Sequence, residues 1–106
     1  MHLSQAGQYT APQGEPNHFV EHLRREALSV GTYSIPAGGV DDQQPHREDE
    51  IYVVTAGRGH LETDEGRTAV GPGDVLFVAA EQPHRFVDIT EDLALLVFFA
   101  PAYSGR

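Results

Sequence analysis

Cysteine is absent from the 106 residues, and basic side chains are scarce: seven stand against sixteen acids. The missing thiols exclude disulfides, thiol catalysis and cysteine-bound zinc, and nothing argues for an oxidising compartment. The formal net charge of −9 disfavours contact with a phosphate backbone, so we expect no nucleic-acid partner. These absences leave a small protein whose chemistry must come from histidine, carboxylate and hydroxyl groups.

Long apolar runs are also missing from the chain. None approaches the roughly 18 residues needed to span a bilayer. The first residues lack the basic region and apolar core of a secretory leader. We therefore expect no membrane partner and a cytoplasmic location.

Short apolar runs separated by turn sequences dominate the chain from His18 onward. They recur about every 8 to 12 residues, which is typical of an all-β domain, a small barrel or a jelly roll. Residues 1–17 are rich in Gln, Gly and Pro and predict an extended arm before a single domain at 18–106. The expected strands cover residues 19–23, 28–35, 50–56, 59–63, 67–70, 74–79, 84–89 and 93–100.

The stretch QQPHREDEIYVVTAGRG, residues 43–59, carries the most informative chemistry. Strand side chains repeat every two residues, so Gln44, His46 and Glu50 share one face if the segment is extended. A carboxylate that faces a barrel interior is costly unless it is paired or bound to a metal. Two alternatives stay open at this point. The segment can bend outward so that Glu50 only caps a loop, or a shifted register can put Glu48 in its place.

Two motifs in the chain resemble those of the cupin superfamily. Gly38, Gln44, His46, Glu50 and Gly57 fit the spacing of the first motif, with Gln44 where its first histidine usually stands. The second motif is matched more loosely, at Gly73, Ala79, Glu81, His84 and Asp88. The resemblance covers roughly residues 28–100 and implies a single-domain cupin with a double-stranded β-helix, or jelly-roll, barrel.

The same resemblance implies a divalent metal site. Its ligands fall on His46, Glu50 and His84. Gln44 is an optional fourth or outer group, and the alternative that it turns to solvent within the Asp41–Pro45 loop stays open. Two histidines and a carboxylate suit Fe(II) or Zn, and Mn or Ni is also compatible. We expect the pocket walls to include aromatic residues of the strands that cross the barrel interior, namely Tyr33, Tyr52, Phe77, Phe86 and Phe98.

Two classes of function fit this site. The first is a small metal-dependent enzyme, an oxidoreductase (dioxygenase-type included) or an isomerase, acting on a small organic substrate. No separate general base or nucleophile stands out, so no catalytic side chain is assigned. The second is a non-catalytic module that binds or senses a small molecule. We also expect a homodimer, in which the arm or the 19–23 strand packs against the other subunit.

Overall fold

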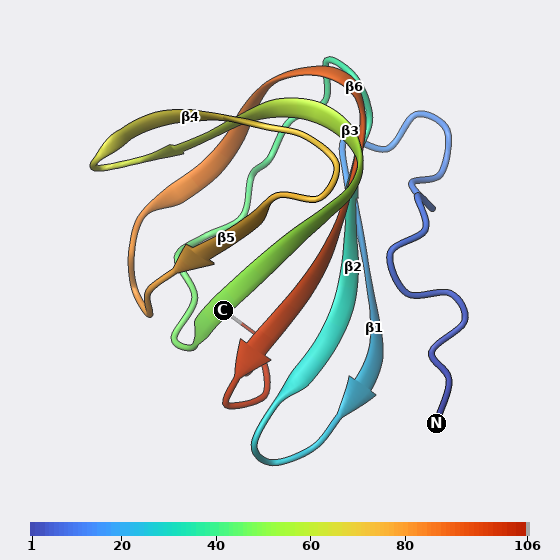
Figure 1. Cartoon of the computed structure of the whole chain (residues 1–106), viewed down its shortest axis with the longest axis vertical. Helices are drawn as coiled ribbons and strands as arrows, with labels where there is room; N and C mark the ends of the chain where they lie inside the picture. Colours follow the sequence, from blue (N-terminus) through green and yellow to red (C-terminus); the bar gives the residue numbers. More distant parts are fainter. Residues whose placement is uncertain (106) are drawn as a thin grey trace.

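The computed structural model describes residues 1–105, and its regular structure in this range is entirely β. One antiparallel sheet runs in the order β1-β2-β6-β3-β4, and β5 pairs with β3 beside this path (Figure 1). The all-β prediction is confirmed. The strands are β1 (His18–Arg24), β2 (Ser29–Ile35), β3 (Asp49–Thr63), β4 (Gly66–Val70), β5 (Val75–Val78) and β6 (His84–Ala100).

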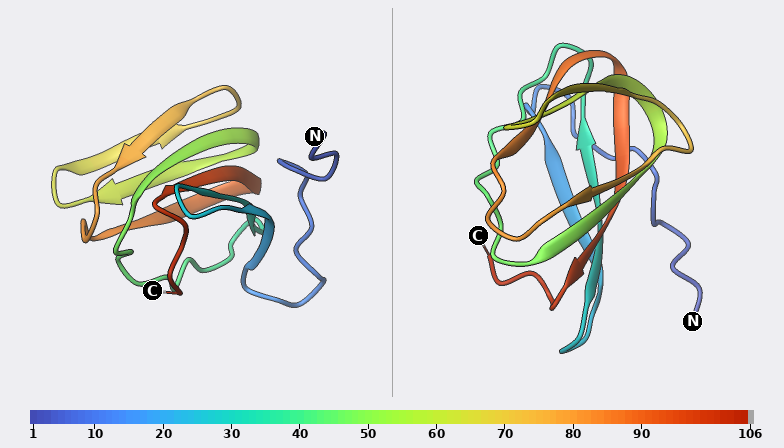
Figure 2. Two further views of the ribbon diagram at one scale, coloured as in Figure 1. Left: turned by 90° about the horizontal axis from the view of Figure 1, so that it is seen from below. Right: turned by 60° about the vertical axis from the view of Figure 1, so that its left-hand side comes forward.

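Two of these strands are longer than the sequence pattern predicts. The expected strands at 50–56 and 59–63 are one continuous strand, β3, and those at 84–89 and 93–100 are one strand, β6. Irregular pairing between Val54 and His60 bends the strand without breaking its ladder. Gly57 lies in this bend with a φ of +87°, and a Cβ there would stand 2.1 Å from the carbonyl oxygen of Asp92. Only glycine fits, and the bend lets the sheet curl on itself (Figure 2).

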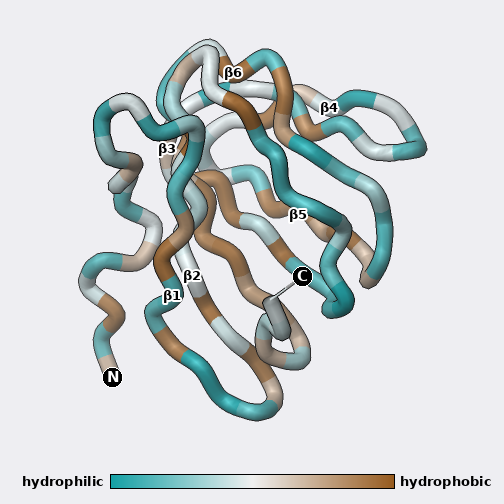
Figure 3. The backbone as a smooth tube through the Cα atoms, turned by 180° about the vertical axis from the view of Figure 1, so that it is seen from behind, coloured by the Kyte–Doolittle hydropathy of each residue, from teal (hydrophilic) through white to brown (hydrophobic). Residues whose placement is uncertain are grey.

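The core lies on the concave side of this curled sheet. Apolar side chains are concentrated on β2, β3 and β6, which Figure 3 shows as brown segments in the middle of the sheet. Alternation along each strand sends every second side chain inward. The largest apolar residues that are almost fully buried are Tyr52, Phe86, Ile35, Leu93 and Leu95.

The N-terminal arm packs against the outer face of its own sheet. The backbone N–H of Gly7 donates to Thr32 Oγ1 (2.8 Å), and that of Thr10 donates to Ser34 Oγ (3.1 Å). Thr55 Oγ1 in turn donates to the carbonyl of Gly7 (2.6 Å). The arm contains no strand and runs beside β1 and β2 (Figure 1). These contacts explain how hydroxyls on the outer face of β2 are buried and satisfied.

The segment that follows β6 folds back toward the open end of the barrel. The backbone N–H of Tyr103 donates to Ser29 Oγ (2.9 Å), and Arg24 Nη2 donates to the Tyr103 carbonyl (2.6 Å). Ser104 Oγ donates to Glu48 Oε2 (2.7 Å). Three residues from distant parts of the chain, Arg24, Ser29 and Glu48, therefore hold Tyr103 and its neighbour Ser104 in place at the barrel mouth. Among the described residues, no helix could span a membrane.

Candidate metal and ligand site

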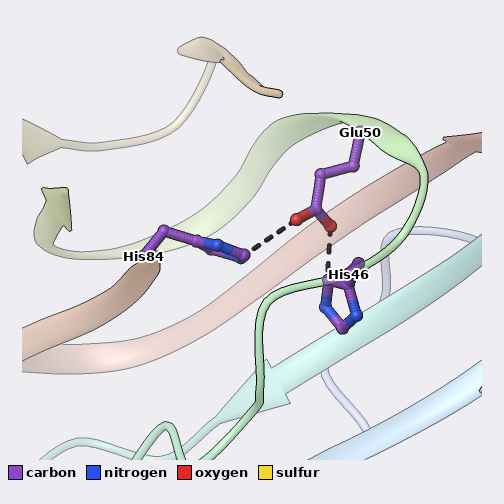
Figure 4. Close-up of side chains that lie close together, drawn as sticks. All are labelled: His46, Glu50 and His84. Carbon is purple, nitrogen blue, oxygen red and sulfur yellow. Dashed lines mark ion pairs between the residues drawn. The ribbon is translucent and has the colours of Figure 1, made fainter. Parts of the chain in front are cut away.

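Two histidines and a glutamate meet in the barrel interior (Figure 4). His46 comes from the loop before β3, Glu50 from the start of β3, and His84 is the first residue of β6. Glu50 Oε1 lies 2.9 Å from His84 Nε2, and Glu50 Oε2 lies 3.9 Å from His46 Nε2. One ligand atom from each residue lies within 4.8 Å of the other two, and all three residues are buried. The structure thus brings together the two histidines and the carboxylate that the sequence motifs singled out.

The Glu50 carboxylate is the least satisfied polar group of the site. Its side chain is 1% exposed, and neither oxygen receives a hydrogen bond from the described residues. His84 is the nearest ring, but its Nδ1 donates to the carbonyl of Gln82 (2.9 Å). A neutral His84 therefore turns a lone pair of Nε2 toward Glu50. Either a second proton on this ring or a cation between the two groups is needed to make the contact favourable.

The charge state of His84 reflects the same contact. Burial alone would lower the pKa of this ring, because desolvation penalises the charged form. The contact with Glu50, the Gln82 carbonyl and the charges of Glu50 and Asp41 outweigh this penalty and raise the pKa above its ordinary value. The contact with Glu50 therefore favours the protonated form of His84. The negative field that raises this pKa is also the field that attracts a metal cation.

The chemistry of the donor set fits a divalent metal ion. Imidazole nitrogen and carboxylate oxygen bind Zn at about 2.0–2.2 Å, so two ligand atoms of one ion lie at most about 4.4 Å apart. Glu50 Oε1 already lies within this distance of His84 Nε2, and Glu50 Oε2 lies within it of His46 Nε2. Three protein ligands also leave positions open for a substrate, as in catalytic zinc and non-haem iron sites. The cluster is a possible metal site that would need only small shifts to close around an ion.

Gln43, rather than Gln44, faces this cluster. Gln43 Oε1 lies 2.7 Å from His46 Nε2 and 3.3 Å from the Tyr52 hydroxyl, whereas Gln44 is exposed. The placement of Gln44 in the barrel rested on strand alternation through residue 44. That reasoning was wrong for this residue, because the chain is an irregular loop until Asp49 and alternation does not hold there.

Asp41 is a second buried carboxylate, and it fixes the loop that carries Gln43. Its Oδ1 accepts the Tyr33 hydroxyl (2.8 Å), and its Oδ2 accepts Gln43 Nε2 (2.8 Å) and the backbone N–H of Phe86 (2.8 Å). The backbone N–H of Gln43 adds a longer contact to Oδ1 (3.3 Å). No pattern in the sequence indicates this network, because its members belong to three separate parts of the chain.

A pocket of about 180 Å³ opens beside His46. Tyr33 and Tyr52 line it, as predicted for their strand positions. Burial is the main cause that raises the pKa of both hydroxyls above their ordinary value, so both phenols stay protonated at neutral pH. Other wall residues were not predicted, and one of them, Tyr103, comes from the C-terminal segment. The remaining lining residues are Asn17, Phe19, Asp42, Gln43, Val97 and Phe99.

Three predicted wall residues do not line this pocket. Phe86 is buried behind it, with its ring edge-on to Tyr52 at 5.0 Å. Phe77 and Phe98 are 62% and 37% exposed. Both pair with Ile51, whose side chain points to the opposite face from those of Glu50 and Tyr52. The strand pattern located these residues on β5 and β6 but did not fix which face they share.

Glu48, the alternative ligand considered for a shifted register, is also buried. It lies apart from the His46–Glu50–His84 cluster, and one of its oxygens accepts the Ser104 hydroxyl. Burial of the neighbouring Tyr103 hydroxyl raises its pKa, and the negative charges of Glu48 and Glu50 raise it further. Glu48 therefore belongs to the contact with the C-terminal segment.

The curled antiparallel sheet with a His–Glu–His cluster inside one end defines a small β-barrel protein with a possible metal site. The chain belongs to the cupin family: the model of the cupin domain matches residues 31–99. A relative from Streptomyces coelicolor, the uncharacterized protein SCO3923, is 41% identical over 86 residues, which cover 81% of this chain and 82% of that protein. The predicted cupin-type jelly roll is confirmed.

Solved structures with lower sequence identity share the fold. An RmlC-like cupin from Shewanella frigidimarina superposes with a TM-score of 0.77 at 21% identity, covering 96% of this chain and 92% of that one. A predicted oxalate decarboxylase from Thermotoga maritima gives 0.69 at 20% identity, with 80% of each chain covered. The DMSP lyase DddQ from Ruegeria pomeroyi gives 0.75 at 19% identity, with 94% of this chain and 54% of DddQ covered. At these identities the likeness concerns the fold alone.

Proposed function

We propose that the protein is a small metal-dependent enzyme whose substrate is a small organic molecule bound in the pocket beside His46. The observation that supports this most directly is the Glu50 carboxylate, which is buried, receives no hydrogen bond from residues 1–105 and faces two imidazoles. Burying a carboxylate in this way is costly, and a divalent cation would repay that cost.

A proton on His84 is the competing explanation for the buried charge. A His84 imidazolium would satisfy Glu50 Oε1 at 2.9 Å, yet Oε2 would still point toward His46 at 3.9 Å without a donor. One ion would satisfy both oxygens and both rings at once. The two-histidine, one-carboxylate set favours Fe(II) or Zn, with Mn or Ni as further candidates.

The residues around the cluster are suited to hold and orient a substrate. When bound, the ion would supply Lewis acidity to an oxygen or nitrogen of the substrate. The Tyr52 hydroxyl, 3.0 Å from His84 Nε2 and 3.3 Å from Gln43 Oε1, remains protonated and can donate a hydrogen bond in the pocket. The rings of Phe99 and Tyr103 stack at 4.7 Å and form one apolar wall of the pocket.

A turnover experiment tests this proposal. Metal-stripped protein is reloaded with Fe(II) or Zn and incubated with a panel of small organic molecules, and products are followed by NMR. We expect conversion of at least one compound by wild type and loss of this conversion in Glu50→Gln. A compound that binds tightly but is recovered unchanged throughout the panel would instead indicate a binding or sensing module.

We further propose that the protein forms a homodimer through the outer face of its sheet. Phe77, Ile51 and Phe98 lie side by side across β5, β3 and β6, and all three are exposed by more than a third. Val75 extends this apolar row at 66% exposure. A contiguous apolar patch of this kind is typical of an interaction surface.

Sedimentation equilibrium at micromolar concentration tests the dimer. We expect wild type at twice the chain mass, Phe77→Ser shifted toward the monomer, and Val40→Ser unchanged. Val40 is a matched control, because it is 59% exposed but lies in the loop after β2. A wild-type monomer under these conditions would contradict the proposal.

A further inference from the structure

The pocket beside His46 is poor in positive charge. The sequence contains no lysine, and none of the arginines among residues 1–105 lines the pocket. Asp42 stands in its wall, and the carboxylates of Asp41 and Glu50 are buried around it. A divalent ion on Glu50 would leave one of these three negative charges uncompensated. An organic anion entering the pocket would therefore meet net negative charge, and residues 1–105 offer it no guanidinium partner.

The amide of Gln43 is held in one orientation. A carboxylate only accepts hydrogen bonds, so the Gln43 atom that lies 2.8 Å from Asp41 Oδ2 must be the nitrogen. The Tyr33 hydroxyl and the backbone N–H of Phe86 hold Asp41 in place. Gln43 therefore turns its oxygen, and not its NH2 group, toward His46 and Tyr52.

Metal binding would change the partners of this oxygen. In the structure, His46 Nε2 donates to Gln43 Oε1 over 2.7 Å, since an amide oxygen can only accept. An Nε2 atom that binds an ion carries no proton. Gln43 Oε1 would then keep only the Tyr52 hydroxyl at 3.3 Å and have a lone pair available for another donor.

The size and walls of the pocket restrict the ligand further. Its volume of about 180 Å³ is close to that of apolar cavities of about 150 Å³ that bind benzene. Phe19, Phe99 and Tyr103 offer ring surfaces: Phe19 lies edge-on to both Phe99 (6.3 Å) and Tyr103 (6.0 Å). A single ring or a short branched chain would fill the space. A cationic donor on Gln43 Oε1 would lie close to an ion held by His46 Nε2, which is 2.7 Å from this oxygen, and the two positive charges would repel at short range.

We propose that this pocket selects an uncharged, ring-sized molecule with a hydroxyl group, which donates a hydrogen bond to Gln43 Oε1 while its apolar part packs against Phe19, Phe99 and Tyr103. Organic anions such as carboxylates are rejected. This inference rests on the proposed metal-dependent function and specifies its substrate class. Gln43 is then the residue that distinguishes a hydroxylated ligand from one without a donor.

Three matched probes test the selectivity: benzyl alcohol, toluene and benzoate, titrated by NMR into zinc-loaded wild-type protein. Benzyl alcohol should bind most tightly. Loss of one hydrogen bond should weaken toluene roughly 3- to 10-fold, in keeping with about 0.5–1.5 kcal/mol for such a bond. We expect benzoate to bind at least about 10-fold more weakly than benzyl alcohol, since its charge would be buried without a partner. Equal or tighter binding of benzoate, or no binding of any probe at millimolar concentration, would overturn the inference.

The variant Gln43→Met tests the assigned residue, because methionine keeps the length of the side chain and removes the acceptor oxygen. Benzyl alcohol should then bind no better than toluene, while toluene affinity and zinc content stay at wild-type values. Gln44→Met is the matched control at the exposed neighbour and should change nothing. A Gln43→Met protein that keeps its preference for benzyl alcohol, or that loses its zinc, would overturn the role given to Gln43.

Zinc content is measured on every sample, which separates the two proposals. A wild-type protein that takes up no ion refutes the proposed function. A protein that takes up its ion and still binds benzoate as tightly as benzyl alcohol refutes the substrate class alone.

Discussion

Asp41 in the loop before β3 and Glu50 at the start of β3 are both buried carboxylates, but their surroundings differ. Asp41 accepts hydrogen bonds from Tyr33, Gln43 and Phe86, whereas neither oxygen of Glu50 accepts one from the described residues. A buried polar group with all its partners stabilises one conformation, and one without them is costly. The contrast suggests that Asp41 maintains the loop and that Glu50 is kept for a ligand that the chain itself does not supply.

The largest effect is expected for Glu50→Gln, measured as zinc affinity. Changing a residue that only hydrogen-bonds a metal ligand typically weakens metal binding by about 10- to 100-fold. Removing the charged ligand itself should weaken zinc binding by more than this. The metal-free variant should be at least as stable as wild type toward urea, because the new amide can donate to His84 Nε2 and no charge is left buried. A loss of stability comparable with that of an Asp41 variant would remove the distinction between the two acids.

Asp41→Asn should show the opposite pattern, with its main effect on folding. The substitution replaces one acceptor oxygen by an NH2 group that faces the donors held by Asp41, so at least one buried donor loses its partner. We expect a fall of about 2–4 kcal/mol in the free energy of unfolding of the metal-free protein, measured with urea. Zinc affinity should fall less than in Glu50→Gln. Unchanged stability would show that the Asp41 network contributes little.

A smaller effect is expected for Tyr33→Phe. This change removes one hydroxyl from Asp41 Oδ1 and leaves the Gln43 and Phe86 contacts in place. The free energy of unfolding should fall by about 1 kcal/mol, the net contribution of an ordinary hydrogen bond. Zinc affinity should stay at the wild-type value. If Tyr33→Phe lost more zinc affinity than Asp41→Asn, Tyr33 would not act on the site through Asp41.

The sequence predicted the parts of the fold that depend on local pattern. Apolar runs separated by turn sequences located the strands of residues 1–105, and the motif spacing pointed to the two histidines and the glutamate that the structure brings together. The bend at Gly57 was read as a break between strands, because a bulge and a turn look alike in sequence. Gln43 was missed in favour of Gln44, since strand alternation was extended into an irregular loop.

Other features depended on contacts that no local pattern encodes. The side of the sheet taken by Phe77 and Phe98 follows from their register with Ile51. The wall formed by Tyr103 depends on the return of the C-terminal segment to Ser29. Tyr103 is the one aromatic residue in the segment PAYSGR, and its aromatic ring was the one feature there that could have suggested a role in the pocket wall.

The central claim, that Glu50 is buried to bind a cation together with His46 and His84, is tested most directly by elemental analysis. Wild-type protein purified without a metal-affinity tag is compared with a His46→Ala, His84→Ala double variant that is purified in the same way. The account predicts close to one divalent ion per wild-type chain and almost none in the variant. The same substoichiometric metal content in both proteins would contradict it.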